Sequence, residues 1–256
     1  MKQLYFIYFF WALEAFSAQA ATILSPNTDS GNSLNTGPFL LPESSFSMRY
    51  QQVFAASDFL PLRNSGGGFI TQIAFRLDSS SPGFIGTIIP DIQVNISSTL
   101  KAPDGLSGVF SENVGANDTV VFQRGSLAVA GIQSGTIGYF INFQTPFFYD
   151  AAPGHNLLLD VKNYQGGYNM LPLQSFSFMD AQDVSGDGVS RVYSYSVNSA
   201  TAEAVDTIGL VTQFTYTPVP EPSAAALFIF GLARVLICSR VLGKKTLSKR
   251  KEWLCQ

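Results

Sequence analysis

Cysteine, histidine and charge are scarce in this chain. Its two cysteines, Cys238 and Cys255, both lie near the C-terminus, so the residues before them can form neither a disulfide framework nor a catalytic thiol. His155 is the one histidine, which excludes a metal site built from several imidazoles. Charged residues make up 13% of the sequence, about half the usual share for a soluble globular protein.

The few charges are distributed unevenly. Residues 22–217 contain seven basic and fifteen acidic residues, a net charge of −8. Residues 234–256 contain seven basic residues and one glutamate, a net charge of +6. The acidic part lacks the clustered Lys and Arg that bind phosphates, so no nucleic-acid partner is expected. The chain is therefore an acidic body with a basic tail.

The N-terminus has the pattern of a secretory signal peptide over residues 1–21. Lys2 is followed by an apolar run at residues 4–13, and the small-residue sequence Ala18-Gln19-Ala20 forms the cleavage box. Glu14 is an imperfection in this pattern, and a buried N-terminal helix is the alternative. A signal peptide implies passage through the secretion translocon and an exported body.

The C-terminal segment, residues 218–256, combines three features. Two prolines hold the chain extended around Glu221, an apolar run over residues 224–238 approaches the length that spans a bilayer, and a basic cluster follows. The cluster orients the segment with its end in the cytoplasm and the body outside. The short extended motif is Val219, Pro220, Glu221 and Pro222, and the basic cluster is Arg240, Lys244, Lys245, Lys249, Arg250 and Lys251.

This end resembles the PEP-CTERM sorting signal of exported bacterial proteins. The resemblance implies that a membrane-embedded, exosortase-type enzyme recognises the segment, cuts near Pro220–Pro222, and releases the body or transfers it to the surface. Arg234 within the apolar run and the long basic end depart from the family pattern. An ordinary membrane anchor that is never cut is the alternative.

The body is predicted to be all-β, because period-two alternation recurs and no long helical periodicity is present. The clearest alternating sets predict strands around residues 92–96, 139–143, 157–161, 193–197 and 208–216, with further strands at 48–54, 70–77, 119–123, 126–130 and 173–179. Glycine, proline and aspartate turns separate them. This pattern predicts a β-sandwich of jelly-roll type over residues 47–217, preceded by a flexible leader or irregular edge at residues 22–46.

No motif in the body specifies a reaction. His155 lies in a turn sequence without a nucleophile elbow to pair with it, so an exposed turn residue is the favoured interpretation. Asp180, Asp183 and Asp187 are weak candidates for a Ca²⁺ loop, since the EF-hand spacing and its closing glutamate are missing. No spacing selects a pair of carboxylates for glycoside hydrolysis. No cofactor is expected.

Aromatic side chains are the other candidates. Exposed rings could stack on sugars beside amide groups, but large aromatics dominate sandwich interiors and a core role is favoured. The rings concerned are Tyr139, Phe147, Phe148, Tyr149, Tyr164, Tyr168, Tyr193 and Tyr195.

Together these features predict an exported, non-catalytic β-sandwich with a structural or adhesive role at the cell surface or in an extracellular polysaccharide matrix. The alternative is a secreted carbohydrate-binding module or a carbohydrate-active enzyme on the same fold. A polysaccharide is accordingly a candidate partner.

Overall fold

The computed structural model describes residues 19–27, 31, 33–35, 37–39, 47–165 and 178–219. The predicted signal peptide, apart from its last residues, and the predicted sorting segment beyond Val219 lie outside these ranges. Within them, no helix is both long enough and apolar enough to cross a bilayer.

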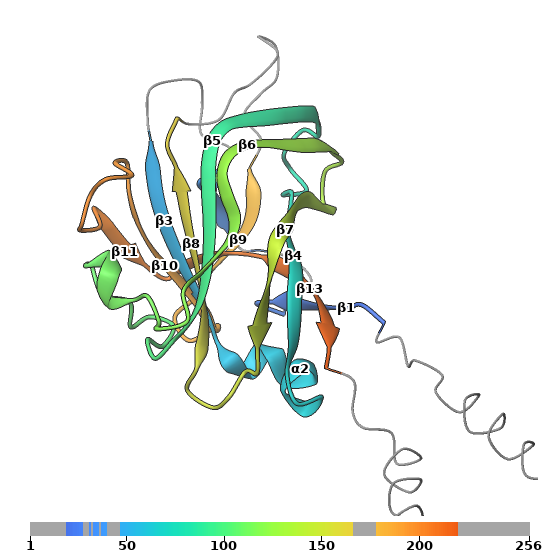
Figure 1. Ribbon diagram of the computed structural model, residues 1–256. Helices are drawn as coiled ribbons and strands as arrows, with labels where there is room; N and C mark the ends of the chain where they lie inside the picture. The colour runs from blue at the N-terminus through green and yellow to red at the C-terminus, as the bar shows by residue number, and fades with distance from the viewer. Residues whose placement is uncertain are drawn as a thin grey trace, which may run out of the picture. The chain divides into compact units, whose positions relative to one another are not determined.

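The described chain is all-β, as predicted, and its strands form three antiparallel sheets (Figure 1). The four-stranded sheet has the order β1 (Ala21–Ser25), β13 (Thr212–Pro218), β4 (Gly68–Arg76), β7 (Ile137–Tyr149). The six-stranded sheet has the order β11 (Ala204–Asp206), β10 (Val189–Ser194), β3 (Met48–Phe54), β8 (Asn156–Asn163), β5 (Phe84–Thr99), β6 (Thr119–Ile132). The small sheet has the order β12 (Ile208–Leu210), β9 (Met179–Asp183), β2 (Ser33–Asn35).

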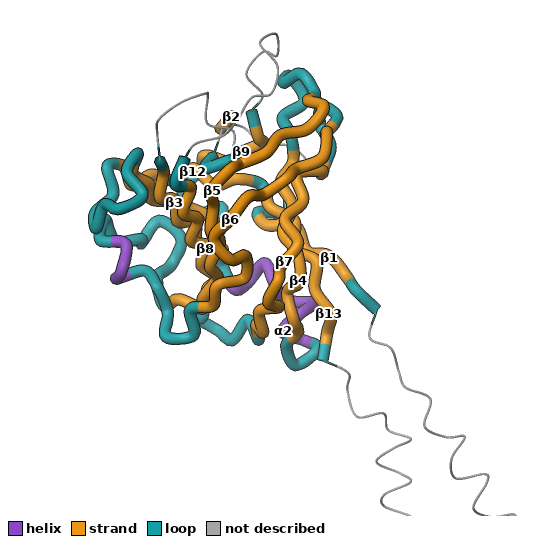
Figure 2. Tube along the Cα trace, turned by 45° about the horizontal axis from the view of Figure 1, so that its top comes forward, coloured by secondary structure: helices purple, strands orange, loops and turns teal. Residues whose placement is uncertain are grey.

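Three short helical segments connect these strands. A 3₁₀ turn, η1 (Ala56–Phe59), leads directly into the helix α2 (Leu60–Asn64), and a second 3₁₀ turn, η2 (Phe110–Glu112), lies between β5 and β6. Pro61 stands in the first turn of α2, where its missing N–H costs no hydrogen bond. Figure 2 shows how small the helical share is beside the strands.

Six consecutive strands pair as a set of nested hairpins. β5 pairs with β6, β4 with β7, and β3 with β8, so each outer pair encloses the next in sequence. The pairs alternate between the two larger sheets, and β8 also pairs with β5 to close the six-stranded sheet. The central contacts of the fold therefore join residues far apart in the sequence.

The main core is shared by the two larger sheets. Inward side chains of β4, β7 and β13 meet those of β3, β5 and β8, and the ring of Phe214 contacts two others edge-on. Its centroid lies 4.9 Å from Phe54 and 5.0 Å from Phe59. Edge-to-face geometry is favoured by the ring quadrupoles. This aromatic contact joins the last strand to the end of η1 and to the six-stranded sheet.

β8 is buried on both faces, which the predicted alternation of Leu157, Leu159 and Val161 with outward residues did not anticipate. Leu158, on the other face, belongs to a second small core with Val53 and Phe110. The segment between β5 and β6 supplies Phe110 and covers this face of the sheet. This connection folds back over the six-stranded sheet, so it buries the face of β8 that the alternation predicted to be exposed to solvent.

Several predicted strand boundaries were wrong. β10 ends at Ser194, so Tyr195 and Val197 lie in the following turn. The strands predicted at 119–123 and 126–130 are one strand, β6. The run predicted at 208–216 divides at Val211 into β12 and β13, which belong to different sheets. In the region predicted as a flexible leader or an irregular edge, residues 22–25 belong to the edge strand β1, which pairs with β13.

A buried charged network holds the segment between β5 and β6 against the six-stranded sheet. The Asp160 carboxylate accepts hydrogen bonds from the Arg49 guanidinium at 2.7 Å and from the Gln51 amide at 2.9 Å. Gln51 also donates to the Phe110 carbonyl and accepts from Asn113. Buried carboxylates need such partners, because desolvation otherwise opposes their charge.

We predict that Asp160→Ala destabilises the fold by about 3–5 kcal/mol, because it leaves a partly buried guanidinium and a buried amide without their acceptor. Urea unfolding of the two proteins measures this difference. Asp91→Ala is the matched control, since Asp91 pairs with Arg124, whose side chain is 54% exposed. A loss for Asp160→Ala no larger than for Asp91→Ala would contradict the prediction.

Candidate functional site

The outer face of the four-stranded sheet carries no ionised side chain. Among the residues of β1, β4, β7 and β13 the only charged one is Arg76, which is buried and paired with Asp180. The other outward residues are mainly threonine, glutamine, asparagine and phenylalanine, with Leu24 at the edge strand. This neutral face contrasts with the net charge of −8 on residues 22–217.

Strand register arranges these side chains in rows across the sheet. One row contains Gln213, Ala74 and Phe140; a second contains Thr215, Gln72 and Asn142; a third contains Thr217, Phe69 and Phe148. Irregularities in β4, opposite β13, and in β7, opposite β4, separate the second row from the third. We call these nine residues the neutral face.

The middle row is a hydrogen-bonded ladder. Gln72 donates through Nε2 to the Asn142 side-chain oxygen at 2.7 Å and accepts through Oε1 from the Thr215 hydroxyl at 3.0 Å. The rows on either side carry half-exposed rings, with exposed fractions of 41% for Phe140, 45% for Phe69 and 44% for Phe148. The rings of Phe69 and Phe148 meet edge-on at 5.4 Å. The neutral face thus holds oriented amides between aromatic surfaces.

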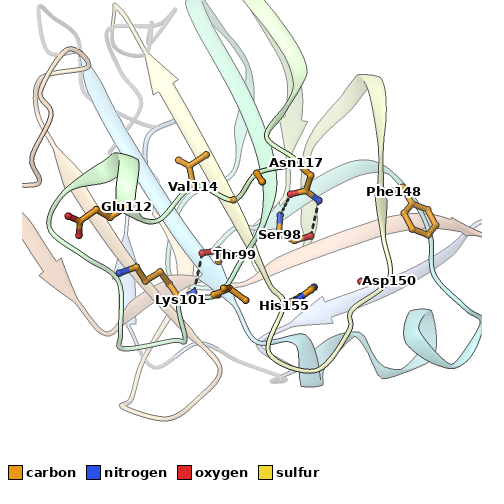
Figure 3. Close-up of a pocket in the computed structure, with 12 residues that line it drawn as sticks. Ser98, Thr99, Lys101, Glu112, Val114, Asn117, Phe148, Asp150 and His155 are labelled. Carbon is orange, nitrogen blue, oxygen red and sulfur yellow. Dashed lines mark hydrogen bonds between the residues drawn. The ribbon is translucent and has the colours of Figure 1, made fainter.

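A hollow of about 520 Å³ lies near one end of the same region (Figure 3). Its wall consists of the end of β5, the segment from η2 to β6, and the end of β7 with the turn that leads to β8. The lining residues are Ser98, Thr99, Leu100, Lys101, Glu112, Val114, Gly115, Ala116, Asn117, Phe148, Asp150 and His155. Asn117 anchors the wall, because its side chain accepts from the Ser98 N–H at 2.8 Å and donates to the Ser98 hydroxyl.

The hollow contains two carboxylates that the sequence did not pair, Glu112 and Asp150. Glu112 accepts from the Ser107 hydroxyl at 2.6 Å, and Asp150 accepts from the Ala152 N–H at 3.1 Å. Figure 3 shows them on opposite sides, with His155 between them. Each carboxylate is hydrogen-bonded to a neighbour in its own segment. His155 is exposed in its turn, as the sequence indicated.

The three candidate calcium ligands have separate partners. Asp180 is buried beside Arg76, Asp183 accepts from the Thr207 hydroxyl, and Asp187 accepts from the N–H groups of Val184 and Val189. Burial raises the pKa of Asp180 and of Asp187 above the ordinary carboxyl value, which disfavours the charged form that a cation requires. Among the described residues, no group of three or more acidic, histidine or cysteine side chains is placed to hold a metal.

The aromatic candidates divide between the interior and the surface. Tyr139, Phe147 and Tyr149 are buried in the main core, and burial raises the pKa of the Tyr139 phenol. Phe148 and Tyr195 are exposed. Tyr164 stacks under the Arg124 guanidinium at 3.6 Å, Tyr193 is partly buried, and Tyr168 lies outside the described residues. Phe69 and Phe140 were missed as surface rings, because only strand register shows that they share a face with Phe148.

Of the predicted sorting residues, the structure describes only Val219. Its N–H donates to the Gly67 carbonyl at 3.1 Å, one residue beyond the end of β13. Pro220, Glu221, Pro222 and the basic cluster lie outside the described residues.

Comparisons with known proteins assign no family. No protein-family model matches the chain. No curated protein matches it. A chain from the crystal structure of the T13 IBDV viral particle is 15% identical with a TM-score of 0.19. That alignment covers 80% of this chain and 41% of the viral one, so this chain spans less than half of its length. A TM-score this low supports no conclusion about fold or function.

We predict that Gly115→Ala distorts the hollow and destabilises the protein by about 1–3 kcal/mol, the usual cost of overpacking. A Cβ at this position would lie 1.7 Å from the Ser98 carbonyl oxygen, which is held in β5. Thermal unfolding measures the effect. Gly108→Ala, in the same segment, is the control, since its Cβ would meet only Val205 at 3.9 Å. Equal melting temperatures for the two variants would refute this prediction.

We also predict that excess Ca²⁺ produces no heat in calorimetry and no shift in melting temperature, because the three aspartates are engaged elsewhere. A bound ion would stabilise the folded state by mass action. A rise in melting temperature that Asp187→Asn abolishes would establish the calcium site instead.

Proposed function

We propose that this chain is an exported, non-catalytic surface or matrix protein whose folded body is delivered by a signal peptide and a C-terminal sorting segment. The body would serve a structural or adhesive role outside the cell. The proposal rests on the resemblance of residues 218–256 to a PEP-CTERM signal and on how the folded body relates to the two predicted cleavage sites.

The observation that carries the proposal is the position of the terminal strands. β1 begins at Ala21, directly after the predicted cleavage box, and β13 ends at Pro218, two residues before Pro220. The two strands are antiparallel neighbours, with Ala21 opposite Tyr216. Cuts at both predicted sites would therefore leave the four-stranded sheet complete. An exported domain needs this arrangement, because processing must not remove a strand.

For the body we propose a shortened jelly roll. A jelly roll is a long hairpin rolled so that successive strand pairs alternate between two sheets. The nested pairs β3–β8, β4–β7 and β5–β6 follow this rule. β10 and β13 extend the two sheets beside β3 and β4. A fold of this kind presents broad sheet faces, which suits adhesion.

The non-catalytic role is favoured by the hollow. Glycoside hydrolysis requires two carboxyl groups on either side of the scissile bond, one of them free to carry a proton. Glu112 and Asp150 are instead bonded to neighbours in their own loops. The second candidate, a carbohydrate-binding module, is favoured by the neutral face, and it is compatible with an adhesive role.

Mass spectrometry of the mature protein, from a host with an exosortase-type enzyme, tests the proposal. We predict an N-terminus directly after the signal peptide, at Ala21 or Thr22, and a C-terminus close to Pro220–Pro222. Replacing Pro220 and Pro222 together by alanine should leave the tail attached, because the extended motif is lost. Pro218→Ala, which lies in β13 outside the motif, is the control and should be processed normally. A mature C-terminus beyond Lys245 would contradict the proposal.

A further inference from the structure

Three phenylalanine rings on the neutral face remain exposed, and packing against the rest of the protein does not explain them. Phe69, Phe140 and Phe148 each keep more than 40% of their surface exposed. Leaving three large rings exposed on one sheet forgoes the free energy that their burial would supply. The rings also flank a row of polar side chains rather than forming a continuous apolar patch. This alternation is the pattern of a surface that recognises a ligand with both apolar and hydroxyl groups.

The ladder offers hydrogen-bonding groups in fixed positions. Because Gln72 bonds to both Thr215 and Asn142, the orientation of its amide is set before a ligand arrives. The Asn142 oxygen accepts from Gln72, which directs the two N–H bonds of the exposed Asn142 amide elsewhere. A preordered row of donors and acceptors loses little side-chain entropy on binding.

The rings are spaced for an extended ligand. Phe140 and Phe148 pair with Ala74 and Phe69, which are five residues apart on β4, a distance of about 16 Å at the usual rise per residue. The Gln72–Asn142 pair lies between them on the same face. A chain molecule along β7 would therefore meet a ring, then amides, then the paired rings of Phe148 and Phe69. Sugar units present C–H groups on their faces, which suit aromatic rings, and hydroxyls on their edges, which suit amides.

Charge selects among the polymers that could lie there. The neutral face offers no cation to pair with a uronate or sulfate, and the body around it is acidic. An anionic polymer would be repelled without compensation. The buried centre of a protein–protein interface is more apolar than its rim, whereas on the neutral face the polar ladder lies in the middle row.

We propose that the neutral face binds a neutral polysaccharide chain lying along β4 and β7, with Phe140, Phe69 and Phe148 as stacking surfaces and the Thr215–Gln72–Asn142 ladder as the polar contact. This inference rests on the adhesive role proposed above and specifies its ligand class and its surface. The hollow lined by His155 is not part of this surface, although Phe148 borders both.

The test uses the full chain, purified in a detergent without a sugar head group, and sedimentation with insoluble neutral glycans: cellulose, chitin and mannan. Calcium alginate serves as the acidic counterpart. We expect retention by at least one neutral glycan and none by alginate. Phe140→Ala and Asn142→Ala should each weaken retention by on the order of tenfold, the effect of losing one good contact. Phe140→Trp should retain binding, because it restores a ring.

Two matched controls locate the site. Tyr195→Ala removes a ring of similar exposure (50%) outside the neutral face, and His155→Ala alters the hollow. Neither should change retention. Absence of binding to all three neutral glycans would overturn the inference, as would binding that His155→Ala weakens and Phe140→Ala does not. A dimer in sedimentation velocity that Phe140→Ala dissociates would assign the face to a second copy instead.

These outcomes are separate from those of the proposed function. Mature ends at Ala21 or Thr22 and near Pro220, with no glycan retention, would support the export proposal and contradict the proposed ligand. Retention by a neutral glycan together with an intact tail would support the binding surface and contradict the processing. Melting temperatures of all variants, measured in parallel, identify any variant that has lost its fold.

Discussion

Nested pairing of distant strands is the constraint on which the rest of this structure depends. The residues before Cys238 contain no cysteine and the chain few charges, so the fold must be held by backbone hydrogen bonds and apolar burial. β3 and β8 are separated by the whole of β4 to β7, yet their pairing brings Tyr50 opposite Val161 and closes the six-stranded sheet. Such contacts cost loop-closure entropy, and the shared aromatic core offsets that cost.

The same pairing determines which surfaces can act. One face of the six-stranded sheet is covered by the segment containing Phe110, held through Gln51 and Asp160. Its polar groups are therefore used to close the fold. The outer face of the four-stranded sheet instead keeps its rings and amides exposed. Which face is covered depends on where the long connections fold back. The neutral face is left uncovered, so its rings and amides are available to bind a ligand.

The local sequence predicted strands of the nested pairs, such as β3, better than the strands outside them, such as β10, β12 and β13. The segment 48–54 was predicted with its observed limits, because its branched and aromatic residues lie between turn signals on both sides. Tyr193 and Tyr195 alternate as a strand would, but the ladder with β3 ends with Ser194 opposite Arg49, so Tyr195 follows the last residue of β10. The boundary between β12 and β13 at Val211 could not be predicted from the sequence either, because the alternation of apolar and polar residues continues where the chain passes from one sheet to the other.

For the candidate site, the sequence by itself determined the chemistry present and the chemistry excluded. One histidine, a body without cysteine and a net charge of −8 over residues 22–217 are properties of composition, and no folding changes them. It also determined the period-two pattern that makes the chain all-β. Only the tertiary structure decided which residues act together. Phe69, Gln72, Asn142, Phe148 and Thr215 lie as much as 146 positions apart, and they share one face because β4 pairs with both β7 and β13. Register is set by packing of the opposite face into the core, which is a property of the whole fold and not of any segment.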